Sequence, residues 1–144
     1  MASIESSSGQ KAGEPIDRES HPPPPRQGFP EAVRCAGSGI ARVWRREPNF
    51  RRQVAAGLAA TVTGACLGLA PVEWAVLALT IALVLSLECA NSALEALADA
   101  LHPGHCAGVG HAKDIAAGAV WAASLGALAV GLCLFLPKLL ALTL

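Results

Sequence analysis

The sequence predicts an all-helical integral membrane protein, with one amphipathic surface helix followed by three membrane-spanning helices. Hydrophobic residues make up 53% of the 144 residues, and the mean hydropathy is +0.45. After Val54 the charged residues are few: Glu73, Glu88, Glu95, Asp99, Lys113, Asp114 and Lys138. Long apolar runs with so few charges are typical of helices that cross a bilayer. The length fits one domain.

The first 29 residues differ in composition from the rest. They are rich in Ser, Gly and Pro and include a run of four prolines at 22–25. Such a segment cannot bury a hydrophobic core. We therefore predict a disordered tail at 1–29 and one membrane domain at 30–144. A proline-rich ligand for a partner protein is an alternative role for the tail.

Residues 30–47 have the pattern of an amphipathic helix. Apolar side chains such as Val33, Ile40 and Trp44 recur at helical spacing, and the opposite side carries arginines. A basic helix with a tryptophan at its boundary is typical of a helix lying on a membrane surface. Gly37 and Gly39 weaken the helical pattern at its centre.

Three spans are predicted, at 50–69, 72–101 and 112–136. The first holds 16 uncharged residues after Gln53, which is near the lower limit for crossing a core of about 30 Å. A tight turn at 70–73 separates it from the second, and the third is expected to stop at Pro137. Small residues at four-residue spacing, such as Gly64 and Gly68, favour close helix packing. Three short helices can enclose few polar groups, so an oligomer is expected.

The distribution of arginines predicts the orientation. Arginines flank the start of the first span, whereas the turn at 70–73 carries only Glu73. Because positive residues favour the cytoplasmic side, the N-terminus and the 102–113 loop are expected in the cytoplasm. The arginine segment, the polar end of the second span and the Lys113–Asp114 pair then meet at the cytoplasmic membrane face.

The second span carries a stripe of polar residues. Starting from Glu88, the next members follow at offsets of three, four, seven and eleven residues: Asn91, Ser92, Glu95 and Asp99. These offsets place all of them on one helix face. A charged group at the centre of a spanning helix costs about 2.5–3.5 kcal/mol on insertion scales, so it usually marks a site. Asp99 alone could instead end the helix at the water interface.

These groups suit phosphoryl transfer. Carboxylates at a membrane boundary can hold Mg²⁺ shared with phosphates, and a partly desolvated glutamate can act as a general base. A lysine near a helix start can hold phosphate oxygens. No P-loop or protein-kinase glycine loop is present. The same carboxylates could relay protons in a small transporter, and no nucleic-acid partner is expected.

The loop after the second span carries a further candidate cluster: His102, His105, Cys106 and His111. Three imidazoles and a thiol could bind zinc, but their spacing matches no familiar zinc module. The five cysteines occur singly, without a CxxC pair, so all five are expected to be reduced.

At the stripe and its flanks the sequence resembles the prokaryotic diacylglycerol kinase family of small membrane lipid kinases, which includes the undecaprenol kinases. The resemblance covers about residues 32–140. It is carried by Glu88-x-x-Asn91-Ser92-Ala93-x-Glu95-x-x-x-Asp99, by Ala112-Lys113-Asp114-x-Ala116-Ala117-Gly118-Ala119-Val120 and by Glu47-x-Asn49-Phe50-Arg51.

The resemblance implies a homotrimer in the bacterial cytoplasmic membrane that uses ATP and Mg²⁺ to phosphorylate a lipid hydroxyl in sites shared between subunits. It implies that Glu88 is the general base, that Asn91 holds the polar network, and that Glu47 and Glu95 bind the metal. The implied catalytic residues are Glu88, Asn91, Lys113 and Asp114. The implied ATP-binding residues are Glu47, Glu95, Asp99, Gly104, His105, Cys106, Lys113 and Asp114. The implied lipid-binding residues are Trp44, Asn49, Phe50, Arg51 and Glu88.

The sequence departs from the family in one loop. Relatives carry Glu-Tyr-His where this chain has Gly104-His105-Cys106, which removes a carboxylate and an aromatic ring. His105 could stack in place of the tyrosine. Similarity to the undecaprenol kinase branch favours undecaprenol over diacylglycerol as the lipid. This similarity lies around Glu73-Trp74, Asn49-Phe50-Arg51 and Phe135-Leu136-Pro137-Lys138. A proton-coupled transporter and a membrane anchor remain the alternatives from other classes.

Overall fold

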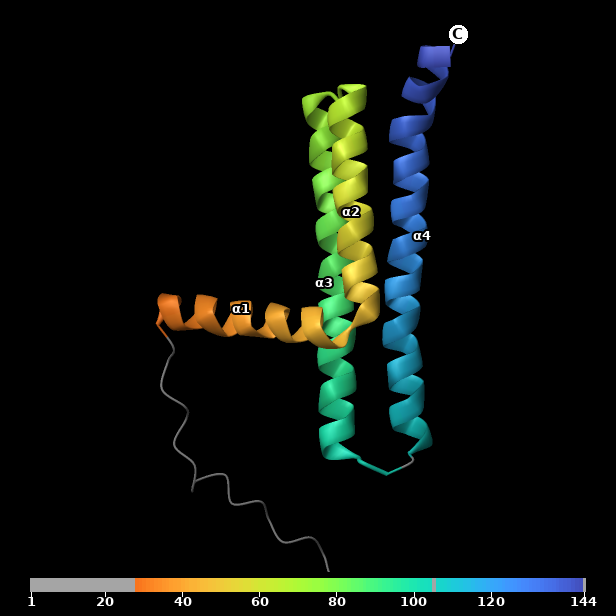
Figure 1. The fold of residues 1–144 in the computed structure, drawn as a ribbon. Coiled ribbons are helices and arrows are strands. Elements are labelled where there is room, and N and C mark those ends of the chain that lie inside the picture. The colour runs from red at the N-terminus through yellow and green to blue at the C-terminus, as the bar shows by residue number, and fades with distance from the viewer. Residues whose placement is uncertain (1–27, 105, 144) are drawn as a thin grey trace, which may run out of the picture.

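The computed structural model describes residues 28–104 and 106–143, and within these ranges it contains helices and no strand. The helices are α1 (Phe29–Arg46), α2 (Pro48–Leu67), α3 (Pro71–Leu101) and α4 (Ala107–Thr143). Figure 1 shows α2, α3 and α4 running alongside one another, while α1 projects sideways from the bundle at the lower end of α2, below the middle of α3. The predicted all-helical class is confirmed. The predicted tail at 1–29 lies outside the described ranges except for Gly28 and Phe29, and Phe29 already begins α1.

Helix α1 is continuous through Gly37 and Gly39, as an amphipathic helix over nearly the predicted range. It ends at Glu47, whose extended backbone precedes Pro48 at the start of α2. A residue before proline is pushed out of the helical conformation, and proline suits the first turn of a helix. The chain therefore turns sharply between α1 and α2. None of the α1 residues is buried within the chain.

Helix α2 ends in a turn that glycine makes possible. Gly68 has φ +64°, a left-handed conformation that glycine adopts without strain. The amide of Leu69 donates to the carbonyl of Gly64 at 3.2 Å, and the amide of Ala70 donates to Glu73 Oε2 at 2.6 Å. Pro71 then starts α3. A tight turn joins the two helices, but it lies at 68–70 rather than at the predicted 70–73, and α2 lies two residues earlier than predicted.

Helix α4 is longer than the predicted span at both ends. The prediction that it starts at Ala112 and stops at Pro137 is wrong, because it begins at Ala107 and continues through Pro137 to Thr143. Proline removes one backbone hydrogen bond, but spanning helices tolerate it where neighbouring groups support the chain. Here Lys138, just after the proline, forms an ion pair with Glu73 of α3 at 3.0 Å.

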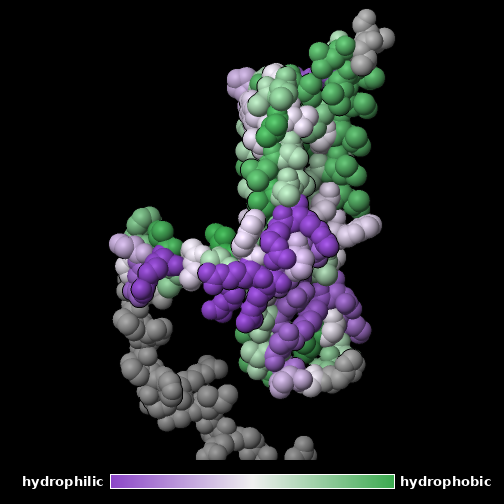
Figure 2. All heavy atoms as spheres, in the orientation of Figure 1, coloured by the Kyte–Doolittle hydropathy of each residue, from purple (hydrophilic) through white to green (hydrophobic). Residues whose placement is uncertain are grey.

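Most large apolar side chains of the bundle face outward. Trp121 is 70% exposed and Leu79 is 71% exposed, whereas the buried apolar residues include Phe50, Leu69, Leu77 and Val84. Figure 2 shows an apolar surface over the upper bundle and a polar surface where α1 joins it. Soluble monomers rarely expose so large an apolar area, so this surface fits a membrane. Among the described residues, α3 and α4 are long and apolar enough to cross one, and the crossing by α2 stays a prediction.

Gly64 is required for close packing at the upper turn. A Cβ atom there would lie 2.7 Å from Leu69 Cδ1 and 3.3 Å from Trp74 Cη2. Because Leu69 is buried, it cannot easily move aside. We expect Gly64→Ala to lower the free energy of unfolding by about 1–3 kcal/mol, measured by thermal unfolding in detergent. Gly37→Ala is the control, since no atom lies within 4 Å of its Cβ position. Equal losses in both variants would contradict the packing argument.

Candidate active site

Glu88 is a buried carboxylate in the middle of the bundle. It lies on α3 with 4% of its surface exposed. Gln53 of α2 donates a hydrogen bond from Nε2 to Glu88 Oε2 at 3.1 Å, and Ser92 Oγ donates to the Glu88 carbonyl at 2.9 Å. Among the described residues no cation pairs with this carboxylate. A buried carboxylate held only by a neutral amide is costly for stability, which is typical of a functional group.

A second polar pair lies one turn further along α3. Asn91 Nδ2 donates to Glu95 Oε1 at 2.8 Å, so two members of the predicted stripe are joined by a side-chain hydrogen bond. Two amide oxygens, Asn91 Oδ1 and Gln53 Oε1, are buried without a hydrogen-bond partner among the described residues. Such groups lose free energy unless they meet a donor. They therefore offer acceptor positions next to Glu88 and Glu95 for water or for a ligand.

Asp99 and Lys113 join the lower ends of α3 and α4. Lys113 Nζ forms an ion pair with Asp99 Oδ1, with Lys113 30% and Asp99 69% exposed. Exposed ion pairs contribute little to the stability of a fold, so stability alone does not explain why Lys113 and Asp99 are paired. Lys113 was expected next to a helix start. The structure corrects this, since α4 begins at Ala107 and Lys113 lies in its second turn. Asp114 follows it on the exposed side of α4.

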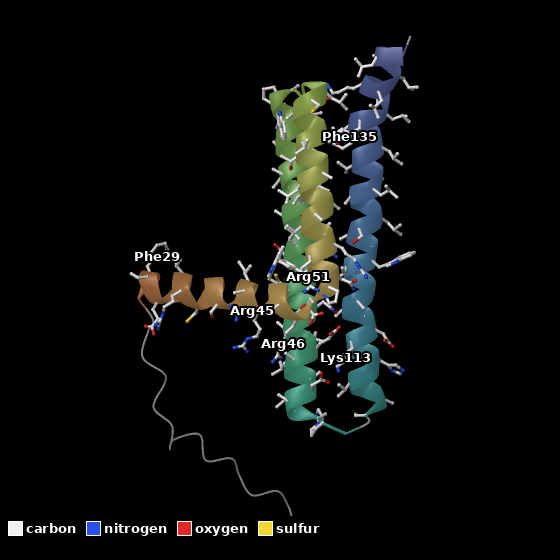
Figure 3. The ribbon with its side chains drawn as sticks, viewed as in Figure 1. Phe29, Arg45, Arg46, Arg51, Lys113 and Phe135 are labelled. Carbon is white, nitrogen blue, oxygen red and sulfur yellow. The ribbon has the colours of Figure 1, made fainter. Side chains whose placement is uncertain are left out.

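A polar cavity of about 610 Å³ lies between α1 and α3. It brings together three predicted ATP-site residues, Glu47, Glu95 and Asp99. Figure 3 shows Arg46 and Lys113 at this level of the bundle, where α1 meets it. The complete lining is Ala36, Ser38, Gly39, Ile40, Arg42, Val43, Arg46, Glu47, Cys89, Ser92, Ala93, Glu95, Ala96 and Asp99.

An apolar cavity of about 580 Å³ runs between α2, α3 and α4. Its lining is aliphatic except for a few groups such as Thr80, Ser124 and Gln53. Gln53 therefore borders this cavity and also donates a hydrogen bond to Glu88. Two neighbours of Glu88 on α3, Cys89 and Ser92, border the polar cavity. Glu88 lines neither cavity itself, but Leu85 before it on α3 lines the apolar cavity and Cys89 after it lines the polar one, so it lies between the two. Sequence reasoning missed Gln53, although a polar residue at the start of an apolar run was a visible signal.

Four predicted lipid-site residues gather at the corner between α1 and α2. The rings of Trp44 and Phe50 meet edge to face with centroids 6.4 Å apart. Arg51 Nη1 donates to the carbonyl of Trp44 at 2.9 Å, and Asn49 Oδ1 accepts a bond from Arg52 Nη1 at 3.1 Å. Phe50 is 6% exposed, so it also packs the corner. These contacts fix the corner one helical turn before Gln53.

The 102–113 loop is shorter than predicted, because α4 begins at Ala107. Gly104 and Cys106 are exposed, away from the polar cavity lining, and His105 lies outside the described residues. Among the residues described, no group of three or more His, Cys, Asp or Glu side chains is arranged to hold a metal ion. The zinc alternative at His102, Cys106 and His111 therefore has no support there. All five cysteines are free.

The fold and the site define a class, a helical membrane protein with a buried carboxylate between a polar and an apolar cavity. Residues 34–135 match the profile of the family described as prokaryotic diacylglycerol kinase. The chain is 38% identical over 104 residues to undecaprenol kinase of Bacillus subtilis (strain 168), covering 72% of this chain and 85% of that protein. It is 40% identical over 112 residues to diacylglycerol kinase of a Synechocystis strain, covering 77% of this chain and 64% of that protein.

The chain therefore belongs to the prokaryotic diacylglycerol kinase family, and it is a lipid kinase. The sequence resemblance to this family is confirmed. The family also agrees with a membrane location. The alternative of a proton-coupled transporter finds no support in these comparisons.

Proposed function

We propose that this chain transfers the γ-phosphoryl group of ATP to the hydroxyl of a membrane lipid alcohol, with undecaprenol favoured over diacylglycerol. The proposal is supported by Glu88, a buried carboxylate between an apolar cavity that suits a hydrocarbon chain and a polar cavity that suits phosphates. The proposed kinase domain is 30–144. The reaction takes place at the cytoplasmic membrane face, with the N-terminus cytoplasmic.

In the proposed reaction Glu88 accepts the proton of the lipid hydroxyl. The hydroxyl oxygen forms a bond to the γ-phosphorus while the bond from that phosphorus to the β–γ bridging oxygen breaks, and ADP leaves. Gln53 holds the carboxylate from the side of the apolar cavity. Asn91 binds Glu95 and keeps the polar network in register. General-base catalysis of this kind contributes about 10²–10⁴ in rate.

The residues around the polar cavity fit a magnesium–nucleotide complex. The proposed metal ligands Glu47 and Glu95 both line it and offer only oxygen donors, which Mg²⁺ prefers. Mg²⁺ usually takes one or two carboxylates and completes its shell with waters and substrate phosphates, so two glutamates suffice. The bound ion would neutralise charge on the phosphates. Lys113, Asp99 and Asp114 contact the nucleotide from the lower end of the bundle, with Gly104, His105 and Cys106 nearby in the chain.

The lipid is proposed to reach Glu88 along the apolar cavity that Gln53 borders. The corner residues Trp44, Asn49, Phe50 and Arg51 would flank its head group. We also propose a homotrimer of three-helix subunits. Gly118 and Gly126 of α4 have open space at their Cβ positions, which leaves this face free to meet a neighbouring helix.

The test is a transfer assay with purified protein in mixed micelles. Radiolabelled ATP and Mg²⁺ are supplied with undecaprenol or diacylglycerol in parallel, and EDTA replaces Mg²⁺ in matched samples. We expect faster labelling of undecaprenol and loss of labelling with EDTA. Faster labelling of diacylglycerol would reverse the proposed lipid preference. Labelling that persists in EDTA would contradict the metal requirement.

Replacing Gln53 is expected to lower the turnover number, because Gln53 positions the Glu88 carboxylate. In Gln53→Leu the side chain keeps a similar volume but loses the hydrogen bond to Glu88, so the carboxylate is no longer held toward the lipid. A hydrogen bond to a charged group is worth about 1.5–3 kcal/mol, so we expect kcat to fall by about 10-fold or more. Thr61→Val is the control, because the one bond of Thr61 Oγ1 among the described residues goes to the Gly57 carbonyl of its own helix. Equal kcat values in the two variants would exclude a positioning role for Gln53.

A further inference from the structure

Two arginines of α1 line the polar cavity without a side-chain partner among the described residues. Arg42 and Arg46 are four residues apart, so they lie on one face of the helix, and both border the cavity. Neither forms an ion pair or a hydrogen bond with any described residue. Two other arginines in the same region are engaged. Arg34 pairs with Glu31 at 3.7 Å, and Arg51 bonds the carbonyl of Trp44.

The missing pairs are informative because carboxylates line the same cavity. Glu47, Glu95 and Asp99 border it together with the two guanidinium groups, yet none of the three forms an ion pair with either arginine. Asp99 pairs with Lys113, and Glu95 accepts its bond from Asn91. Each guanidinium therefore keeps its planar set of five N–H donors, which matches phosphate oxygens in a two-point geometry.

We propose that Arg42 and Arg46 bind the phosphate groups of the nucleotide from the α1 side of the cavity, facing the carboxylates on α3. This inference rests on the proposed function and names two further binding residues for it. Figure 3 shows Arg46 below α1, close to where that helix meets the bundle. Arginine pairs with phosphates through short, charge-assisted hydrogen bonds.

A phosphate group could also come from the head of an anionic phospholipid. The cavity favours the nucleotide, because three carboxylates in the same space repel a lone anionic head group. A nucleotide polyphosphate arrives with Mg²⁺, which the carboxylates attract, while the arginines neutralise the remaining phosphate charge. A magnesium–nucleotide complex therefore binds both the arginines and the carboxylates of the cavity. A phospholipid head group would bind only the arginines.

The experiment compares Arg42→Gln, Arg46→Gln and the double variant with the full wild-type chain in zwitterionic micelles. KM for MgATP is measured at saturating lipid, and MgATP binding is measured directly by equilibrium titration. We expect each single variant to raise KM and Kd for MgATP by about 10-fold and the double variant to raise them further, with KM for the lipid unchanged. Arg46→Lys keeps the charge but not the planar fork, and we expect an intermediate effect.

Arg45→Gln is the matched control. Arg45 lies between the two tested positions on the same helix and outside the cavity lining, and its side chain also forms no ion pair with a described residue. We expect its KM and Kd for MgATP to stay within about 2-fold of wild type, as for surface substitutions away from a site. An equal rise in Arg45→Gln would show a general effect of helix charge and overturn the inference.

A second series adds phosphatidylglycerol to the micelles. If the arginines bound phospholipid heads, the variants would lose a dependence on phosphatidylglycerol while keeping wild-type affinity for MgATP, and the inference would be overturned. Wild-type transfer activity with unchanged MgATP affinity in the variants would refute this inference and leave the proposed function intact. Absence of transfer by the wild type would refute the proposed function, and the binding titration would still decide the role of the arginines.

Discussion

Glu88→Gln is expected to lower the rate of lipid phosphorylation by about 10³-fold, near the middle of the range for loss of a general base. The amide has nearly the same shape as the carboxylate, and its oxygen can still accept the bond that Gln53 Nε2 donates at 3.1 Å. It cannot take a proton from the lipid hydroxyl. The initial rate of label transfer from ATP measures the effect, at saturating MgATP and lipid.

Two controls separate lost chemistry from lost structure in this variant. The Kd for MgATP of Glu88→Gln should match that of wild type, because the polar cavity is lined by other residues. Glu73→Gln changes a glutamate at the opposite end of the same helix and should keep its transfer rate within a few-fold. A Glu88→Gln rate within 10-fold of wild type would exclude Glu88 as the base.

Lys113→Met is expected to lower kcat/KM for MgATP by about 10²-fold. Methionine keeps much of the side-chain length but removes the ammonium group, which would bind the phosphates and stabilise charge in the transition state. The present partner of Lys113 is Asp99, and the ammonium group has three donors, so it can contact a phosphate without leaving that carboxylate. Steady-state kinetics with MgATP varied at saturating lipid measures this loss.

A matched lysine lies at the other end of the bundle. Lys138 pairs with Glu73 at 3.0 Å and is 27% exposed, close to the 30% of Lys113. Lys138→Met removes a comparable ion pair without touching the proposed site, so its kcat/KM should stay within a few-fold of wild type. Similar losses in both variants would mean that Lys113 acts through stability rather than through the phosphates.

The sequence was sufficient to predict the helical class and the polar face of α3. Periodicity places Glu88, Asn91 and Glu95 on one face, and the bond between Asn91 and Glu95 follows from their four-residue spacing. The corner between α1 and α2 follows from Pro48, which restricts Glu47 to an extended backbone. These features depend on local chain geometry, which the sequence states directly.

Other features depend on tertiary contacts that no local pattern encodes. The bond between Gln53 and Glu88 joins residues that are 35 positions apart, so periodicity could not reveal it. The continuation of α4 through Pro137 is accompanied by an ion pair of Lys138 with Glu73 on another helix, which no local pattern encodes. The sequence pattern places Arg42 and Arg46 on the polar face of a surface helix. Only the fold shows that they line one cavity with Glu47 and Glu95.

The kinase site is proposed to lie where α1 meets α3. Photolabelling with an azido derivative of ATP in the presence of Mg²⁺, followed by mapping of the labelled peptides, tests it most directly. We expect labelled peptides from α1, from α3 after Glu88 or from the first turns of α4, with labelling blocked by excess ATP. Blockable labelling confined to the turn between α2 and α3 or to the C-terminal turns of α4 would contradict it.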